Sequence, residues 1–293
     1  MKIGWNGSII SQEEAVISFY DHGFLYGMGL FETFRTYGGE PYLLERHLTR
    51  LAEGCDSLGI RCKLDAAELR SWLRELMAAN ELPEAYVRLT VTAGEGVLGL
   101  PTGDYEQPNM LLLVKALPPS PPSLYVDGRE LVLLRTRRNT PEGEVRLKSL
   151  HYMNNIIAKR ELAAIGSAAS GAEGLMLTRD GSLSEGIVSN VFFTREGIVQ
   201  TPSVATGILP GITRGRVMEL AAELPAIAAV EEGLYTWSDL LAADEVWVTN
   251  SIQELVPVTS LRDKAGTVHR VGNGQAGSIT SELLAAYRED TKR

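Results

Sequence analysis

The run LPPSPPS at residues 117–123 constrains the fold of this chain more than any other segment. Four of the thirteen prolines fall within five of its positions. Because proline fixes φ and has no backbone N–H, neither a helix nor a central strand tolerates such a run. We therefore expect an extended linker over residues 118–125, between a domain at 1–117 and a second domain at 126–293.

The composition is that of a globular protein, with 44% hydrophobic and 22% charged residues. The 28 Lys and Arg residues stand against 37 Asp and Glu, a net charge of −9, which disfavours nucleic acid and anionic membrane surfaces as partners. No apolar run is long enough to span a membrane, and the N-terminal segment does not resemble a secretory signal. Cys55 and Cys62 lack metal-ligand spacing, and two reduced thiols are typical of a cytoplasmic protein. We expect a cytoplasmic enzyme that acts on a small molecule.

Strand and helix patterns alternate irregularly, which favours an α+β fold. Asn6-Gly7 predicts a hairpin turn, Asp180-Gly181 a second turn, and Asp65 followed by Glu68 the capped start of a helix. Helices are expected over 44–58, 65–79, 150–165, from 213 onward and over 276–288. Strands are expected over 85–93, 110–116, 130–136, 174–178, 187–194, 228–232 and 245–249.

The glycine pattern GEGVLG at 94–99 matches the dinucleotide fingerprint GxGxxG and follows an expected strand. That fingerprint works by placing a pyrophosphate at the N-terminus of a following helix. Here Pro101, Gly103 and Pro108 follow instead. We therefore predict that this segment is a loop and does not bind a dinucleotide.

Three segments of the second half have the residue types of a cofactor site. The turn GILPGITR at 207–214 feeds an amphipathic helix and leaves its first amides free for a phosphate, although an ordinary surface helix would look alike. Lys148, between leucines, could be a Schiff-base nucleophile or a lysine that reaches solvent. Glu185 precedes an apolar strand and could meet a cationic ring nitrogen or water. Together the three are the parts that a pyridoxal phosphate (PLP) enzyme must supply.

The order of the motifs resembles the class IV, or branched-chain aminotransferase-like, family of fold type IV PLP enzymes. The resemblance covers nearly the whole chain. It implies a small α/β sandwich domain, a larger pseudo-barrel domain, a PLP cofactor held between them, and a homodimer. It rests on DHGFLYGMGLFE at 21–32, RHLTRL at 46–51, the Lys148 segment, EGIVSNVF at 185–192, GILPGITR at 207–214 and TNSIQELVPV at 249–258.

The resemblance also implies roles for individual residues. Lys148 would bond covalently to the cofactor as the catalytic residue, and Glu185 would pair with the pyridine nitrogen. The phosphate would be bound by Arg46, by the backbone amides of Ile212 and Thr213 and by the Ser251 hydroxyl, with Asn190 as a further cofactor contact. The candidate substrate-binding residues are Phe31, Arg88, Arg138 and Asn250, with Arg137 as an additional candidate.

Two activities follow from this resemblance. The first is a lyase reaction in which Lys148 removes a proton from an amine-bearing ring carbon, pyruvate leaves and the ring becomes aromatic. The second is amino-group transfer on branched-chain or other amino acids. Phe31 and the segment 92–94 lack the carboxylate-binding groups of D-amino-acid aminotransferases, which disfavours that activity.

Overall fold

The computed structural model describes residues 1–166 and 171–292. Backbone contacts divide the chain into two compact units. The first comprises Met1–Pro119 together with Leu147–His151, and the second comprises Ser120–Arg146 together with Tyr152–Arg293. The predicted domains kept all of 126–293 together, whereas here a short segment around Lys148 belongs to the first unit.

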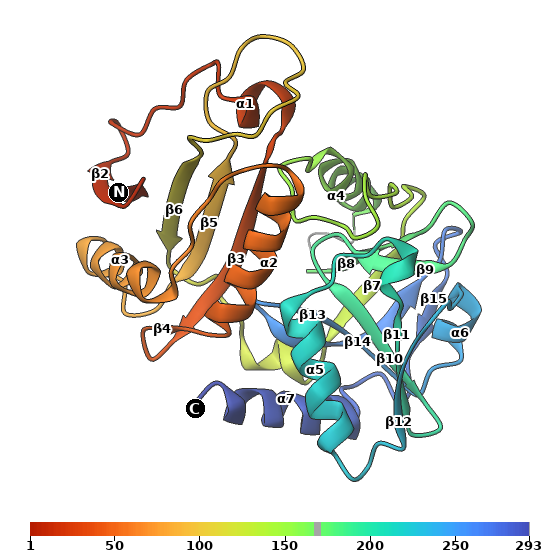
Figure 1. The fold of residues 1–293 in the computed structure, drawn as a ribbon. Coiled ribbons are helices and arrows are strands. Elements are labelled where there is room, and N and C mark those ends of the chain that lie inside the picture. Colours follow the sequence, from red (N-terminus) through yellow and green to blue (C-terminus); the bar gives the residue numbers. More distant parts are fainter. Residues whose placement is uncertain (167–170, 293) are drawn as a thin grey trace. The chain divides into compact units, whose positions relative to one another are not determined.

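The first unit is built on a six-stranded sheet with the strand order β2-β1-β6-β5-β3-β4 (Figure 1). Its helices α2 and α3 cover one face of the sheet and bury a common core with it. The elements are β1 (Lys2–Trp5), β2 (Ser8–Ser11), α1 (His22–Tyr26), β3 (Gly29–Tyr37), β4 (Glu40–Pro41), α2 (Leu44–Ser57), α3 (Ala66–Ala79), β5 (Tyr86–Thr92) and β6 (Asn109–Lys115).

Local sequence rules account for several of these elements. Asn6 and Gly7 both adopt positive φ, 47° and 82°, which is the backbone of the predicted hairpin turn between β1 and β2. The Asp65 side chain accepts hydrogen bonds from the amides of Ala67 and Glu68, so the predicted start of α3 is confirmed. The segment 94–99 starts no helix, as expected for a loop.

The segment Leu147–His151 extends the first sheet along β3. Ser149 forms a bridge with Leu30, the amide of Phe31 donates to the carbonyl of Lys148 at 2.9 Å, and the amide of Leu150 donates to Gly29 at 3.0 Å. This pairing uses the backbone of residues 148–150. It explains why the helix expected over 150–165 begins only at Met153.

The second unit contains a nine-stranded sheet with the order β12-β11-β10-β13-β14-β7-β8-β9, and β15 pairs with β14. Helices α5 and α7 lie side by side, joined by the Arg216–Asp290 ion pair (Figure 1). The elements are a short 3-10 helix η1 (Pro122–Tyr125), β7 (Arg129–Leu133), α4 (Met153–Ile165), β8 (Glu173–Leu177), β9 (Leu183–Gly186), β10 (Asn190–Arg195), β11 (Ile198–Pro202), η3 (Val204–Thr206), α5 (Ile212–Glu223), β12 (Ala229–Gly233), α6 (Trp237–Leu241), β13 (Glu245–Asn250), β14 (Glu254–Arg262), β15 (Val268–Arg270) and α7 (Ser278–Asp290).

Alternate residues of β7 point into different cores, as the pleat of a strand requires. Leu131 and Leu133 join a core with residues of β10, β13 and β14, whereas Val132 packs with Ala158 and Leu162 of α4. The sheet is therefore buried on both faces around β7. A strand so enclosed has little freedom to move, which makes it a rigid support for the turns at its ends.

The strand expected over 187–194 is wrong at its start. Residues 187–189 form a turn between β9 and β10, closed by a 2.7 Å hydrogen bond from the amide of Gly186 to the carbonyl of Ser189. The linker expected to be extended over 118–125 ends in the 3-10 helix η1, since Pro122 suits the first position of a helix.

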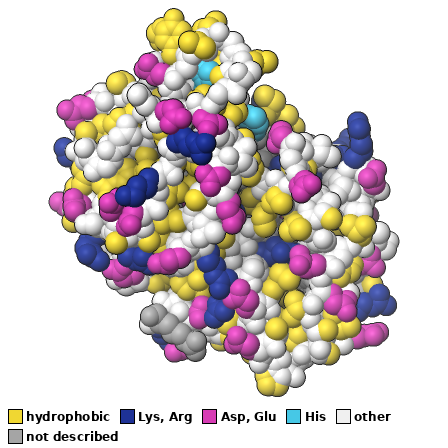
Figure 2. All heavy atoms as spheres, in the orientation of Figure 1, with side chains coloured by type: hydrophobic (Ala, Val, Ile, Leu, Met, Phe, Trp, Pro, Cys, Tyr) yellow, Lys and Arg dark blue, Asp and Glu magenta, His cyan; other side chains and the backbone are white. Residues whose placement is uncertain are grey.

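Several large hydrophobic side chains of the first unit are exposed. Figure 2 shows hydrophobic side chains at the top of that unit, where Figure 1 places α1 and the loop after β5. Acidic and basic side chains are interspersed over the same face. Across the described part of the chain, no helix has the length and apolar character needed to cross a membrane. The exposed side chains of this apolar surface are Val16, Ile17, Phe19, Tyr20, Phe24, Val97, Leu98 and Leu100.

Candidate active site

In the first unit, Lys148 lies beside an aromatic ring that a second cation also contacts. Its Nζ is 4.6 Å from the centroid of the Phe31 ring, and the Arg88 guanidinium carbon is 3.6 Å from the same centroid. Phe31 is buried, and Lys148 is half-buried. A ring face attracts cations, so Phe31 holds both positively charged groups at one place on the sheet. The structure thus brings together three of the predicted site residues.

A buried ionic network occupies the helix-covered face of the same strand. Glu32 of β3 accepts a hydrogen bond from Nδ1 of His47 at 2.6 Å and two from Arg50, at 2.8 and 2.6 Å. Burial alone would raise the pKa of Glu32, but the charge of Arg50 and the hydrogen bond with His47 lower it to about 2. The pKa of His47 is also lowered, chiefly by burial and further by the charges of Arg50 and Lys148. Glu32 is therefore a fixed negative charge inside the first unit.

Arg46 and Arg50, one turn apart on α2, differ in environment. The Arg46 residue is exposed, whereas the Arg50 side chain is 16% exposed and pairs with Glu32. The role expected for Arg46 at the phosphate stays a prediction. Arg50 was missed, although its spacing of three from His47 places both side chains on one face of the helix.

In the second unit, Glu185 lies near the end of β9 and is held on both oxygens. Its Oε1 accepts a hydrogen bond from Nε of Arg138 at 2.7 Å, and its Oε2 accepts one from the amide of Leu209 at 2.9 Å. Nδ2 of Asn190 lies 3.4 Å from Oε2. The side chains of Arg138 and Glu185 are only 8% and 6% exposed. Such a carboxylate has a fixed orientation and can meet a cationic group.

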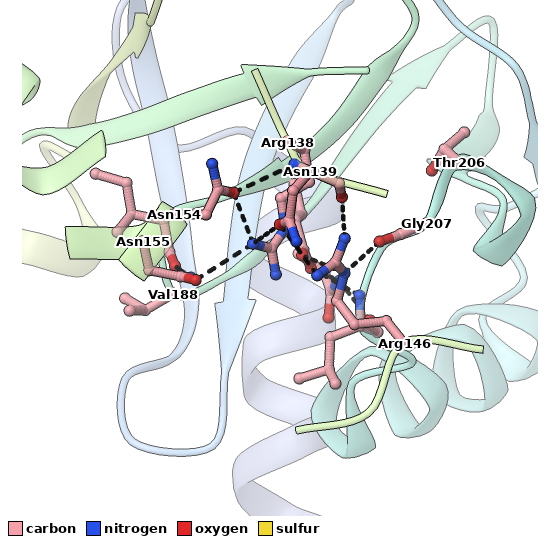
Figure 3. A network of polar contacts seen from close by, with 12 residues as sticks. Arg138, Asn139, Arg146, Asn154, Asn155, Val188, Thr206 and Gly207 are labelled. Atoms are coloured by element: carbon pink, nitrogen blue, oxygen red, sulfur yellow. Dashed lines mark hydrogen bonds and ion pairs between the residues drawn. The ribbon is translucent and has the colours of Figure 1, made fainter. Parts of the chain in front are cut away.

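Two arginines are anchored around this carboxylate. Arg138 also donates to the amide oxygens of Asn154, at 2.8 Å, and Asn155, at 3.2 Å. Arg146 donates to the carbonyl of Gly207, and its Nε is 3.8 Å from Glu185 (Figure 3). Burial and the charge of Arg138 lower the pKa of Arg146 to about 10, against an opposing effect of Glu185. Sequence reasoning did not single out Arg146, although it lies two residues before Lys148.

The turn before α5 has the features of a phosphate site. Its N-cap is Gly211, which has no side chain to cap the first amides, at Ile212 and Thr213. A Cβ at Gly211 would lie 2.1 Å from Oδ1 of Asn190, so only glycine permits this approach. Oγ1 of Thr213 lies 3.2 Å from Oγ of Ser251, which places two hydroxyl groups at the same helix end. Amides, hydroxyls and a nearby carboxylate fit the phosphate and ring nitrogen of PLP.

The two remaining candidates are engaged in local contacts. Oδ1 of Asn250 accepts from the amides of Ile252 and Gln253, at 3.0 and 2.8 Å, so this side chain shapes the turn that carries Ser251. Arg138 is committed to Glu185 through its Nε. No group of three or more His, Cys, Asp or Glu residues within 1–166 and 171–292 could hold a metal ion.

Together, the fold and the geometry of this site identify the family to which the protein belongs. The family model for amino-transferase class IV matches residues 29–261, and the chain belongs to that family. It is 40% identical over 290 residues to aminodeoxychorismate lyase of Bacillus subtilis (strain 168), with 98% of this chain and 94% of the relative covered.

Solved structures agree with this assignment. The crystal structure of 4-amino-4-deoxychorismate lyase from Pseudomonas aeruginosa matches with a TM-score of 0.83 and 31% identity, covering 98% of both chains. The T.th. branched-chain amino acid aminotransferase with pyridoxamine 5'-phosphate matches with a TM-score of 0.83 and 26% identity, covering 99% of this chain and 93% of that one. The predicted fold type IV architecture, a small sandwich domain with a larger pseudo-barrel domain, is confirmed.

Proposed function

We propose that this chain is a PLP-dependent lyase that converts 4-amino-4-deoxychorismate to 4-aminobenzoate and pyruvate, a step of folate biosynthesis. Support comes from the lyase of 40% identity and from the solved lyase of the same fold. The geometric observation that carries the proposal is Glu185, held by Arg138 and Leu209 in the unit whose α5 begins at an uncapped Gly211.

The cofactor and Lys148 have different roles in the reaction. When bound, PLP supplies a ring that accepts the electron pair released at the substrate carbon. Lys148 would hold the cofactor covalently, and its amine, once free, would remove the proton from the amine-bearing ring carbon. The bond between the neighbouring ring carbon and the side-chain oxygen then breaks, and the departing enol takes up a proton to become pyruvate. The remaining ring is aromatic, so the elimination is strongly downhill.

The other predicted residues bind and orient. Glu185, with its two oxygens fixed, would hold a proton on the ring nitrogen. The amides of Ile212 and Thr213, the Ser251 hydroxyl and Arg46 bind the phosphate, where the helix dipole adds to the attraction. Asn190 supports Glu185 and contacts the cofactor. The residues proposed to receive the substrate are Phe31, Arg88, Arg138 and Asn250.

Supplying the substrate without any keto acid tests the lyase. We expect equal amounts of 4-aminobenzoate and pyruvate from the purified chain with PLP. No product from that substrate, but keto-acid-dependent turnover of amino acids, would favour the second candidate, a class IV aminotransferase. The aminotransferase structure matched at a TM-score of 0.83 is such an enzyme, which is why this candidate is kept. A chain that remains colourless after addition of PLP would contradict both.

We also propose a homodimer that works in the cytoplasm, where Cys55 and Cys62 remain free thiols. The exposed apolar side chains around α1 and the loop after β5 support association, since contiguous apolar patches mark interaction surfaces. Light scattering on the wild-type chain and on Phe24→Asp tests it, because Phe24 is 67% exposed. A monomeric wild-type chain would contradict the dimer.

A further inference from the structure

A buried carboxylate outside the predicted site contacts the turn between β9 and β10. Glu173, the first residue of β8, accepts hydrogen bonds from the amide of Ile187 at 2.6 Å and from the amide of Val188 at 3.3 Å. A Cβ at Gly186 would lie 2.9 Å from Oε1 of Glu173 and 2.1 Å from Oγ of Ser189. The carboxylate therefore lies directly against this turn, and the glycine permits the close approach.

This turn separates two residues of the predicted cofactor site. Glu185 ends one side of it and Asn190 begins the other, and their side chains lie 3.4 Å apart. The amide of Val188 donates to Glu173, and the amide of Ile187 donates both to Glu173 and to the carbonyl of Gly174 at 3.0 Å. Removal of Glu173 therefore takes two hydrogen bonds from this turn. The position of Glu185 therefore depends on a carboxylate twelve residues earlier in the chain.

A buried arginine joins Glu173 to a second turn. Nη1 of Arg129, on the neighbouring strand β7, lies 3.9 Å from Glu173, and its Nη2 donates to Oε1 of Gln253 at 3.3 Å. Gln253 follows Ser251 in the turn between β13 and β14, and its backbone carbonyl also accepts from the hydroxyl of Tyr125 at 3.3 Å. One guanidinium thus contacts both the support of Glu185 and the turn that carries Ser251.

Stability alone does not account for such a pair. The side chains of Arg129 and Glu173 are 7% and 6% exposed, and burial raises the pKa of Glu173 against the opposing effects of Arg129 and the two amides. Nε of Arg129 is buried without a hydrogen-bond partner among the residues that the structure describes. Apolar side chains of similar volume often stabilise such a position as well as a buried ion pair does. A geometric role is the better explanation.

We propose that Glu173 and Arg129 are positioning residues: Glu173 fixes the turn 186–189 so that Glu185 meets the cofactor ring, and Arg129 ties that turn to the turn of Ser251. The inference rests on the proposed function only for the identity of the ring. The pair acts through Glu185 and Ser251 and makes no contact with substrate. Outer residues that orient such groups typically change affinity or rate by about 10- to 100-fold when removed.

Three readouts on the full chain test the proposal. With ¹⁵N-labelled PLP, the nitrogen resonance reports whether the ring is protonated, and we expect it to move toward the unprotonated position in Glu173→Ala. PLP affinity should fall about tenfold. Hydrogen–deuterium exchange of the peptide over 186–190, measured without PLP, should become at least about tenfold faster, since the Val188 amide loses its acceptor and the Ile187 amide keeps only the carbonyl of Gly174. Glu173→Gln keeps an acceptor oxygen and should restore most of the protection and affinity.

Glu130→Ala is the matched control. Glu130, the neighbour of Arg129 on β7, forms its own ion pair with Arg262 at 2.9 Å. We expect this variant to lose stability without changing the ring resonance or the exchange of 186–190. If Glu173→Ala behaves like Glu130→Ala, the pair is structural and the proposal is wrong. If Glu173→Ala does not fold, Arg129→Lys decides by the same readouts, with unchanged values contradicting the proposal.

If the proposed function is wrong, the experiments give a result that differs from the failure of the positioning role. A wild-type chain that binds no PLP contradicts the function. The exchange of 186–190 then decides the positioning role alone: faster exchange in Glu173→Ala supports it, and unchanged exchange overturns it.

Discussion

Nε of Arg138 lies 2.7 Å from Oε1 of Glu185, and both side chains are almost fully buried. The second oxygen of Glu185 is held by the amide of Leu209 at 2.9 Å. A carboxylate bound on both sides in this way cannot rotate, so its remaining lone pairs have one direction. Arg138 is also proposed to receive the substrate, and its Nε orients Glu185.

Replacing Arg138 tests this relationship. In Arg138→Met the buried Glu185 loses a charged partner, a change that costs about 3–5 kcal/mol when such a pair is broken. We expect kcat to fall at least about tenfold, together with the free energy of unfolding. Arg135→Met is the control, because Arg135 is an exposed arginine three residues earlier that is not among the candidate site residues. Equal losses in the two variants would contradict a specific role for the Arg138–Glu185 pair.

Lys148 provides the second prediction. Lys148→Ala removes the amine that lies 4.6 Å from the Phe31 ring centroid, and we expect turnover to be abolished while PLP still binds noncovalently. Dialysis should then remove PLP from the variant but not from the wild type. Lys159→Ala, an exposed lysine of α4, should retain both activity and bound PLP. Near-normal turnover in Lys148→Ala would refute the assignment.

Elements with strong local signals could be predicted from sequence. The turn at Asn6-Gly7 and the capped start at Asp65 follow rules that involve a few adjacent residues. The strand-like pairing of Ser149 with Leu30 has no local signal, because it depends on a partner far away in the chain. The expected start of the following helix was three residues too early for that reason.

The site residues also fall into those that the sequence could predict and those that it could not. Lys148 and Glu185 could be proposed because their residue types, neighbours and motif order indicate the chemistry. Glu32 could not be paired with His47 or Arg50 from sequence, since the helix period does not say which strand residue the helix will cover. Supporting residues are identified by contacts, and contacts require the fold.

The phosphate assignment gives the third prediction. If Arg46 binds the phosphate, Arg46→Gln should weaken PLP binding about tenfold and leave the binding of pyridoxal, which lacks the phosphate, unchanged. Arg50→Gln should chiefly lower the free energy of unfolding, because Glu32 remains buried without its arginine. Fluorescence titration with both ligands measures the difference. A selective loss of PLP affinity in Arg50→Gln, with Arg46→Gln unaffected, would transfer the phosphate role to Arg50.

The last prediction concerns acid stability. The pKa of His47 is lowered in the folded chain, so below about pH 6.5 the unfolded chain binds a proton that the folded chain does not. The contribution of His47 is therefore present above that pH and is lost as the pH falls toward the folded pKa. Glu32, with a pKa of about 2, contributes above about pH 4.3 and loses that contribution as the pH falls toward 2. Both effects make acid destabilising.

Urea unfolding of the wild type and of His47→Gln between pH 7.5 and 4 measures the first effect. A difference of one bound proton changes the free energy of unfolding by about 1.4 kcal/mol per pH unit, so the variant should show a shallower decline below pH 6.5 by up to that amount. His269→Gln is the control, because the His269 side chain is 38% exposed and is not part of the Glu32 network. Parallel curves for the wild type and His47→Gln would show that His47 does not take up a proton on unfolding. The acid sensitivity would then arise from Glu32 and other carboxylates, whose loss of charge occurs at lower pH.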